Sequence, residues 1–398
     1  MQHLMNTYGR LPVSIARGEG PWVWDTEGRR YLDALTGIAV TGLGHAHPRV
    51  VAAIAEQAAR VIHASNLYRI PEQERLADTL ARVSGMDRAF FCNSGCEANE
   101  AAIKLARLHG HHRGIEQPVI VVMEKAFHGR TMATLSATGS RKVQAGFEPL
   151  LAGFARVPYG ERAPLESLAS RNGHVVAVLA EPIQGEGGIH IPDEGWLRFL
   201  RELCDRQGWL LMLDEVQSGM GRTGRWFAHQ HAGIVPDVMT LAKGLGNGVP
   251  IGACLARGPA AEVFTPGKHG STFGGNPLVC AAAQATLDAI EQEQLMENAT
   301  RMGGLIRAGL AQKLDGVAGV CQIRGKGLMI GIELDRPCGE LVSHGLRAGL
   351  LINVTSETVV RLLPPLILQA AEAGLLVDTL AGLIRAFLQA ETAAPVAG

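Results

Sequence analysis

A lysine and an aspartate, two residues with the chemistry of a reactive site, each stand at the end of an apolar segment. Asp214 follows the segment 210–213, and Lys243 follows the segment 238–242 and opens a loop with three glycines. A lysine removed from water tends to lose its proton and can then attack a carbonyl carbon. A buried carboxylate is costly unless a cation or a hydrogen-bond donor pairs with it. The pair predicts a site where an amine nucleophile and a partnered acid act on one ligand.

Each of the two residues also has a plainer interpretation. An isolated lysine is ordinarily a surface residue, although the end of an apolar strand disfavours that role for Lys243. Asp214 could hold a metal or act as a Walker-B-like acid, but no phosphate-loop Gly-Lys-Ser/Thr precedes it. A pyridinium nitrogen is another partner that a buried carboxylate can take, and Lys243 would then meet the same ligand.

Two turns rich in small residues precede predicted helices, at residues 93–100 and 269–277. Unpaired N–H groups at the start of a helix attract phosphate, and glycine permits its close approach. Helix capping alone would explain either turn. Two phosphate-compatible turns, one buried acid and one buried lysine nevertheless fit a single ligand, and the combination is more specific than any one of them.

The central part of the chain alternates short apolar segments with helical stretches such as 97–109. The segments that predict strands are residues 89–92, 118–123, 175–180, 210–213, 238–242 and 251–256. Continuous apolar strands between helices are typical of a mostly parallel sheet that is covered on both faces. Ligands of such sheets bind beyond the carboxyl ends of the strands, which is where the polar motifs fall.

The flanking parts predict a smaller α+β domain. Before the central part, the expected elements are a hairpin over 22–25 and 30–33 and helices over 50–61 and 72–83. After it, they are a long helix from 277 past 307, strands over 327–334, 350–354 and 359–363, and a helix over 375–388. We therefore expect an N-terminal segment (1–60) that contributes to the small domain, a large domain (61–280), and an interdomain helix with the C-terminal small domain (281–398).

Composition excludes several classes of function. The 37 basic and 38 acidic residues give a net charge of −1, so no nucleic acid and no anionic membrane surface is expected as a partner. No stretch approaches the ~20 apolar residues of a membrane span, and residues 1–10 lack the pattern of a signal peptide. Seven scattered cysteines indicate a reduced, cytoplasmic protein.

No metal site is expected. Cys92 and Cys96 lack a second pair at zinc-site spacing. His45 and His47 have no evident carboxylate partner, and a turn ahead of Pro48 is the favoured role for them.

These motifs resemble those of the class III aminotransferases, which belong to the fold-type I superfamily of pyridoxal-phosphate enzymes. The resemblance runs over nearly the whole chain, including residues 18–20, 43–48 and 361–365. Within the class, residues 8–13, 37–40, 66–68 and 73–77 are most similar to the acetylornithine branch. The resemblance implies an α/β fold with a large domain around a mostly parallel sheet and a smaller α+β domain.

The resemblance also implies a set of residues that bind pyridoxal 5'-phosphate. They are Gly95, Cys96, Phe127, Asp214, Glu215, Val216, Gln217, Lys243 and Thr272. Lys243 would hold the cofactor as a Schiff base, with Asp214 on the ring nitrogen. The turn at Gly95 and Cys96 would bind the phosphate, although many relatives have Ala or Thr at the second position.

Three further roles follow from the same resemblance. Phe127 and Val216 would pack on opposite faces of the ring, and Gln217 would reach its phenolic oxygen. Thr272 would bind the phosphate of the cofactor in the other subunit, which implies a homodimer with shared sites.

A second set of residues is implied for the substrates, namely Arg130, Ser271, Glu181, Glu186 and Arg361. A guanidinium pairs well with a planar carboxylate, so Arg130 would hold the amine donor and Arg361 would hold 2-oxoglutarate. Glu186 would neutralise Arg361 when the amine donor is bound. A surface ion pair is the plainer role for either arginine.

The resemblance implies that the terminal amine of N2-acetyl-L-ornithine passes to 2-oxoglutarate, as in arginine biosynthesis. The products would be N-acetyl-L-glutamate 5-semialdehyde and glutamate. Ile38 stands where the ornithine branch usually has Tyr, which favours an acylated amine. Succinyldiaminopimelate, succinylornithine, ornithine and 4-aminobutyrate are alternative substrates. An aminomutase and an inactive cofactor-binding protein are alternatives of another class.

Overall fold

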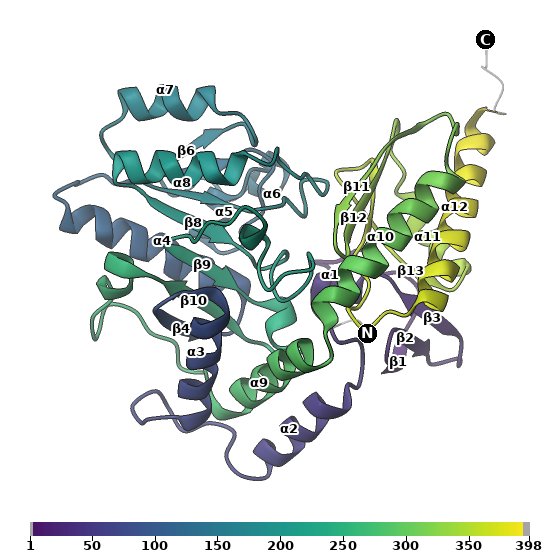
Figure 1. Cartoon of the computed structure of the whole chain (residues 1–398), viewed down its shortest axis with the longest axis horizontal. Coiled ribbons are helices and arrows are strands. Elements are labelled where there is room, and N and C mark those ends of the chain that lie inside the picture. The colour runs from purple at the N-terminus through teal and green to yellow at the C-terminus, as the bar shows by residue number, and fades with distance from the viewer. Residues whose placement is uncertain (1–2, 393–398) are drawn as a thin grey trace.

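The computed structural model describes residues 3–392 and places them in a large and a small domain (Figure 1). The large domain contains a seven-stranded sheet in the order β4-β10-β9-β8-β7-β5-β6. Its strands are β4 (Arg88–Cys92), β5 (Val119–Met123), β6 (Phe154–Val157), β7 (Val175–Ala180), β8 (Leu210–Asp214), β9 (Val238–Leu241) and β10 (Gly252–Ala256). Strand β10 runs antiparallel to both of its neighbours, β4 and β9, and the other neighbouring pairs are parallel. The predicted α/β architecture around a mostly parallel sheet is confirmed.

Helices cover both faces of this sheet, which explains why its central strands are apolar throughout. On β8, the side chain of Met212 packs in a cluster with α4 (Gly95–His112), whereas Leu211 and Leu213 pack in another cluster with α8 (Trp196–Gln207). Successive side chains of a strand point to opposite faces, so a strand between two helical layers needs apolar residues at every position.

The remaining helical elements of the large domain are shorter or lie at its edges. They are α3 (Pro71–Ser84), α5 (Met132–Ala137), α6 (Arg141–Gln144), α7 (Ala163–Arg171), and the 3-10 turns η1 (Ala228–His231), η2 (Lys243–Leu245) and η3 (Gly258–Glu262). Helix α3 begins with Pro71 and ends at Gly85, which has a left-handed φ of 73°. These residues favour a helix start and a helix end respectively.

The small domain is built on an antiparallel sheet in the order β11-β12-β15-β14. Its strands are β11 (Val320–Lys326), β12 (Met329–Leu334), β14 (Asn353–Thr355) and β15 (Val359–Leu362), and its helices are α10 (Leu295–Lys313), α11 (Glu340–Arg347) and α12 (Ala370–Thr392). Strand β11 was not predicted, because its exposed polar positions interrupt the apolar pattern.

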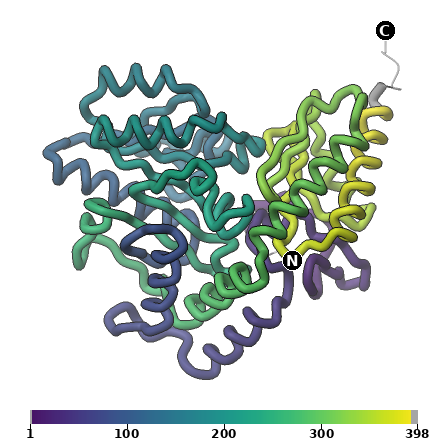
Figure 2. Tube along the Cα trace, in the orientation of Figure 1, coloured from purple at the N-terminus to yellow at the C-terminus, as the bar shows by residue number. Residues whose placement is uncertain are grey.

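The N-terminal strands join the C-terminal part of the chain. They are β1 (Ile15–Glu19), β2 (Trp22–Asp25) and β3 (Arg30–Asp33), and β3 pairs in parallel with β13 (Leu350–Leu351). In Figure 2 the first purple strands lie with the green and yellow C-terminal part of the chain, where β3 pairs with β13. The segment predicted as one strand over 350–354 is therefore two short strands in different sheets.

The long helix predicted from residue 277 past 307 is wrong. The chain forms α9 (Pro277–Gln292) and then α10, separated at Gln294, which has a left-handed φ of 53°. Helix α9 packs against α2 (Pro48–Ala58), and α10 packs against α12. The break thus lets one chain segment cover parts of both domains.

The predicted lack of carboxylate partners for two histidines is also wrong. Nε2 of His45 lies 2.9 Å from Oδ2 of Asp33, and Nε2 of His47 lies 3.4 Å from Oε2 of Glu293. His47 directly precedes α2, whose first residue is Pro48. Within residues 3–392, no group of three or more side chains forms a candidate metal site. Over the same residues, no helix is long and apolar enough to cross a membrane.

Candidate active site

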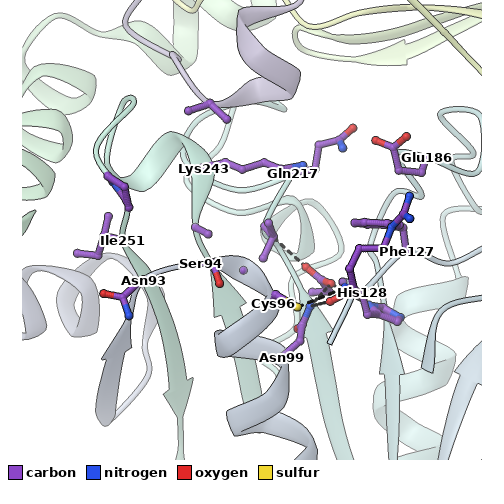
Figure 3. Close-up of a pocket in the computed structure, with 18 of the residues that line it drawn as sticks. Asn93, Ser94, Cys96, Asn99, Phe127, His128, Glu186, Gln217, Lys243 and Ile251 are labelled. Atoms are coloured by element: carbon purple, nitrogen blue, oxygen red, sulfur yellow. Dashed lines mark hydrogen bonds and ion pairs between the residues drawn. The ribbon is translucent and has the colours of Figure 1, made fainter. Parts of the chain in front are cut away.

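A cavity of about 370 Å³ lies where β8 and β9 end and α4 begins (Figure 3). The first residue of its wall is Val40, which directly follows α1 (Thr36–Ala39). The predicted site residues that line it are Gly95, Cys96, Phe127, Arg130, Glu181, Glu186, Asp214, Val216, Gln217 and Lys243. The volume lies in the range of small-molecule sites, about 300–1,000 Å³. Residues spread over some 150 positions are thus brought together by the sheet topology.

Lys243 follows β9 and starts the turn η2 with a left-handed φ of 47°. A non-glycine residue in this conformation is strained, and such strain often occurs at functional sites. Burial lowers the pKa of Lys243, Glu186 raises it and Arg361 lowers it further, and the net direction is downward. A lysine of this kind is more readily available as a neutral amine nucleophile.

Asp214 ends β8 with its carboxylate buried and surrounded by N–H donors. Oδ2 lies 2.8 Å from Nδ1 of His128 and 2.8 Å from Nδ2 of Asn99. Oδ1 accepts a hydrogen bond of 3.0 Å from the backbone N–H of Val216. The chain therefore turns directly after Asp214 instead of remaining extended, and Val216 still reaches the cavity wall.

The turn before α4 both caps the helix and lines the cavity. Oγ of Ser94 accepts a hydrogen bond from the backbone N–H of Glu97 at 3.2 Å, so the capping role is real. Gly95 lies so close to Val216 that an added Cβ would stand 2.7 Å from Cγ1 of that valine. Sγ of Cys96 accepts from the N–H groups of Arg130 and Thr131 at 3.3 and 3.4 Å. The first N–H groups of α4 remain available to an anion.

Arg361 on β15 lies fully buried behind the cavity wall. Its Nη1 lies 2.5 Å from Oε1 of Glu186 and 3.5 Å from Oε1 of Gln217, and its Nε donates to Oδ1 of Asn353 at 2.9 Å. Nη2 is buried and has no hydrogen-bond partner among the described residues. Burial would raise the pKa of Glu186, but the nearby guanidinium lowers it on balance. A buried unpaired N–H group next to the cavity suits a carboxylate ligand.

Glu181 lines the cavity with both carboxylate oxygens already in use. Oε1 accepts from the backbone N–H of Phe127 and Oε2 accepts from that of Gly185, each at 3.0 Å. Burial raises the pKa of Glu181 to about 7; the His128 ring counteracts this and Asp214 adds to it. The predicted contact of Glu181 with substrate stays a prediction.

Arg130 is exposed and lies where two cavities meet. It lines the cavity of about 370 Å³ and a second one of about 830 Å³, which also share Phe127 and Glu186. Its guanidinium carbon lies 5.8 Å from the ring centre of Phe127. Arg130 therefore stands at a point that a substrate entering from the larger cavity would pass.

Four predicted site residues do not line the first cavity, namely Arg361, which lies behind its wall, and Glu215, Ser271 and Thr272. The carboxylate of Glu215 accepts hydrogen bonds from Ser218 and from the N–H groups of residues 228 and 229. Ser271 and Thr272 lie in the loop before α9, and Thr272 is exposed. The roles of these residues stay predictions.

Asn99 and His128 hold the Asp214 carboxylate and were not predicted. His128 could have been suspected from its position beside Phe127. Asn99 is a polar residue on the apolar face of α4, because Ala102 and Ile103, three and four positions on, are also buried. A polar side chain at such a place needs a hydrogen-bond partner, and this was the available signal.

The chain matches the family described as aminotransferase class-III over residues 4–384, and it belongs to that family. An acetylornithine aminotransferase from Nitrosomonas europaea is 60% identical over 389 residues, which cover 98% of this chain and 99% of the relative. The crystal structure of acetylornithine aminotransferase from Elizabethkingia anophelis has a TM-score of 0.86 at 35% identity and covers 96% of both chains.

An ornithine aminotransferase structure from Toxoplasma gondii has a TM-score of 0.94 at 34% identity, and covers 98% of this chain and 93% of that chain. It contains pyridoxal phosphate at partial occupancy in its active site. The chain described here is accordingly a pyridoxal-phosphate-dependent aminotransferase.

The residues of the cavity fit this cofactor. A Cβ at Gly95 would collide with Val216, so the turn that is predicted to meet the phosphate is closely packed against the residue that is predicted to cover the ring. Asp214 accepts three hydrogen bonds from N–H groups, the pattern of a carboxylate that can receive a ring N–H. Lys243 lines the same cavity and can reach an aldehyde held there.

Proposed function

We propose that the protein transfers the terminal amine of N2-acetyl-L-ornithine to 2-oxoglutarate. The observation that carries this proposal is that every carboxylate lining the cavity already has partners. Asp214 binds Asn99 and His128, Glu186 binds Arg361, and Glu181 binds two backbone N–H groups. A free α-ammonium group would need an acidic partner, whereas an acylated, neutral nitrogen needs none.

The apolar surroundings of Ile38 support the same choice. Ile38 packs against a cluster that contains Ile183, Ile189 and Leu363. An acyl group can be accommodated by such a surface through apolar contact. A charged ornithine amine would lose hydration there without compensation.

The two arginines account for the two acids of the reaction. Arg130 at the entrance would bind the carboxylate of the amine donor, and Arg361 would bind 2-oxoglutarate through its unpaired Nη2. Both can pair with a carboxylate in a planar, two-bond geometry. Glu186 would form its ion pair with Arg361 again when the amine donor is bound.

The protein's own residues would supply proton transfer and orientation. Pyridoxal phosphate, when bound, supplies an electron sink for the negative charge that develops on the reacting carbon. The amine of Lys243 would remove the proton from the reacting carbon of the donor and, in the second half of the reaction, deliver a proton to the reacting carbon of the keto acid. Asp214 would keep the ring nitrogen paired, and Phe127 and Val216 would exclude water from the ring faces.

A comparison of amine donors tests the proposal. The loss of the visible absorbance of the lysine-bound cofactor would be followed with acetylornithine, succinylornithine, succinyldiaminopimelate, ornithine and 4-aminobutyrate, without keto acid. We expect acetylornithine to have the highest second-order rate constant. A faster reaction with ornithine would contradict the proposal. Lys243→Ala should lack the lysine-bound absorbance and should release no aldehyde product with any donor.

We further propose that the active form is a homodimer that shares its sites. Thr272 lies beside exposed apolar side chains: Phe273 is 62% exposed, Tyr68 71% and Leu67 87%. Asn66 joins this surface to the loop by donating to the backbone oxygens of Ser271 and Gly274. Exposed apolar patches of this kind are typical of protein interfaces.

A mixing experiment tests the shared site. Lys243→Ala and Thr272→Ala chains would be combined after each is purified, and sedimentation would establish the dimer. A hybrid dimer contains one site with both native residues, so activity should rise above that of either variant alone. An unchanged activity in a verified hybrid would contradict the shared site.

All seven cysteines are free, which supports a cytoplasmic location.

A further inference from the structure

Asn99 on α4 and Thr240 on β9 form a buried hydrogen-bonded chain that ends on Asp214. We propose that Asn99 is a positioning residue that fixes the rotation of the Asp214 carboxylate, and that Thr240 fixes the amide of Asn99. This inference rests on the proposed placement of the cofactor, with its ring nitrogen on Asp214. Asn99 and Thr240 are each about 1% exposed, so neither amide nor hydroxyl has water as an alternative partner.

The orientation of the Asn99 amide follows from its partners. Nδ2 lies 2.8 Å from the backbone oxygen of His128, which can only accept a hydrogen bond. The hydroxyl of Thr240 lies 2.8 Å from Oδ1 and therefore donates to it. The second hydrogen on Nδ2 is directed to Oδ2 of Asp214, also at 2.8 Å. Both donors of the amide are thus used, and a flipped amide would place its oxygen against two acceptors, the backbone oxygen of His128 and the Asp214 carboxylate.

The position of Thr240 explains how it reaches this amide. Thr240 lies opposite Asp214 in the parallel pairing of β8 and β9, so both side chains point to the same face of the sheet. Helix α4 passes over these strands and brings Asn99 between them. The hydroxyl of Thr240 therefore connects to Asp214 through the side chain of Asn99.

This chain makes the two oxygens of Asp214 unequal. Oδ2 receives hydrogen bonds from Asn99 and His128, which fill its two acceptor sites. Oδ1 receives one bond, from the backbone N–H of Val216. One acceptor site of Oδ1 is left, and it is the site that a ring N–H would use. A terminal carboxylate rotates easily. The hydrogen bond from Asn99 to Oδ2 therefore holds the free acceptor site of Oδ1 in one direction.

The test uses the apoprotein and two cofactors that differ at one atom. Pyridoxal phosphate and its analogue with CH in place of the ring nitrogen would be titrated by quenching of tryptophan fluorescence. Thr240→Val removes the hydroxyl with little change of shape, and Thr240→Ser keeps it. Thr286→Val is the matched control, because Thr286 is also fully buried and donates only within its own helix, to Ala282.

We expect Thr240→Val to weaken pyridoxal phosphate binding about fivefold, the order of one hydrogen bond. Binding of the analogue should be unchanged, since it offers no N–H to Asp214. Thr240→Ser and Thr286→Val should bind both compounds as the native protein does. Equal weakening of both compounds in Thr240→Val would overturn the proposal and indicate a merely structural role.

Two further results distinguish a failure of this proposal from a failure of the cofactor placement on which it rests. If the native protein bound both compounds equally, Asp214 would not contact the ring nitrogen, and the placement of the cofactor would be wrong. If Thr240→Val failed to fold, Asn99→Leu would replace it, with urea unfolding as the check of folding. The same selective loss for pyridoxal phosphate is expected there, about tenfold because the donor to the carboxylate itself is removed, and its absence would overturn the proposal.

Discussion

Oε1 of Glu186 lies 2.5 Å from Nη1 of Arg361, and this ion pair joins the loop after β7 in the large domain to β15 in the small domain. The backbone oxygen of Glu186 accepts hydrogen bonds from Thr355 and Ser356 in the same small-domain hairpin. The loop is thus anchored through its backbone, so its carboxylate can move away from Arg361 without carrying the loop with it.

Glu186→Gln should strengthen the binding of 2-oxoglutarate, about five- to tenfold, because the keto acid no longer competes with a carboxylate for Arg361. The dissociation constant would be measured on the amine-loaded enzyme. Glu333→Gln is the matched control, since Glu333 pairs with Arg324 on the neighbouring strand and lies outside the cavity. Weaker binding in Glu186→Gln would contradict the competition.

Arg361→Lys should raise the KM for 2-oxoglutarate by about 10- to 100-fold, since lysine cannot form the two parallel hydrogen bonds of a guanidinium. The half-reaction with the amine donor should change much less. Arg201→Lys serves as control, because Arg201 is an ion-paired, largely buried arginine that binds Asp237 away from the site. An equal loss in both half-reactions would argue against a specific role in keto-acid binding.

The sequence predicted the large domain well because its signals are local. Segments such as 175–180 are apolar at every position, and this is a requirement of a strand buried on both faces. Asp214 and Lys243 were found for the same reason, since each is a charged residue at the end of an apolar segment that forms such a strand. Their roles in cofactor binding came from family resemblance and not from spacing.

What was missed depends on contacts between distant segments. Gln294 has no glycine or proline beside it, so its left-handed conformation is imposed by packing of α9 and α10 on different neighbours. The partners of His45 and His47 are likewise set by tertiary structure. Asn99 reads as one polar residue in an alanine-rich helix, and only the pairing of β8 with β9 shows that Thr240 and Asp214 meet it.

Glu181 should make the stability of the protein depend on pH. Its pKa is raised to about 7 by burial, from 4.5, so the folded protein holds this proton more tightly than the unfolded chain. Between these two values the folded state binds more protons, and the free energy of unfolding falls as pH rises. The contribution amounts to about 3 kcal/mol across the full window.

Urea unfolding of the native protein and Glu181→Gln from pH 4 to 8 would isolate this effect. The free energy of unfolding of the native protein should fall relative to that of Glu181→Gln as pH rises through 7. Glu291→Gln is a suitable control, because Glu291 is exposed, paired with Arg82, and has a lowered pKa. A difference that does not vary with pH would show that Glu181 does not titrate in this range.

Gly95→Ala should weaken both folding and cofactor binding through Val216. The new Cβ would stand 2.7 and 2.9 Å from the two methyl groups of Val216, so that side chain must shift within the cavity wall. Overpacking of this kind costs about 1–3 kcal/mol, and a comparable loss in cofactor affinity is expected. Gly173→Ala is the control, since nothing lies within 4 Å of its added Cβ.

The double variant Gly95→Ala/Val216→Ala separates a collision from a loss of backbone freedom. Val216→Ala alone removes packing and should destabilise the protein, yet it also removes the atoms that the new Cβ would meet. The double variant should therefore be more stable than the sum of the two single effects allows, by at least ~1 kcal/mol in urea unfolding. Cofactor affinity measured on the same proteins should follow the same order. Simple additivity would mean that Gly95 is required for its backbone rather than for the space beside Val216.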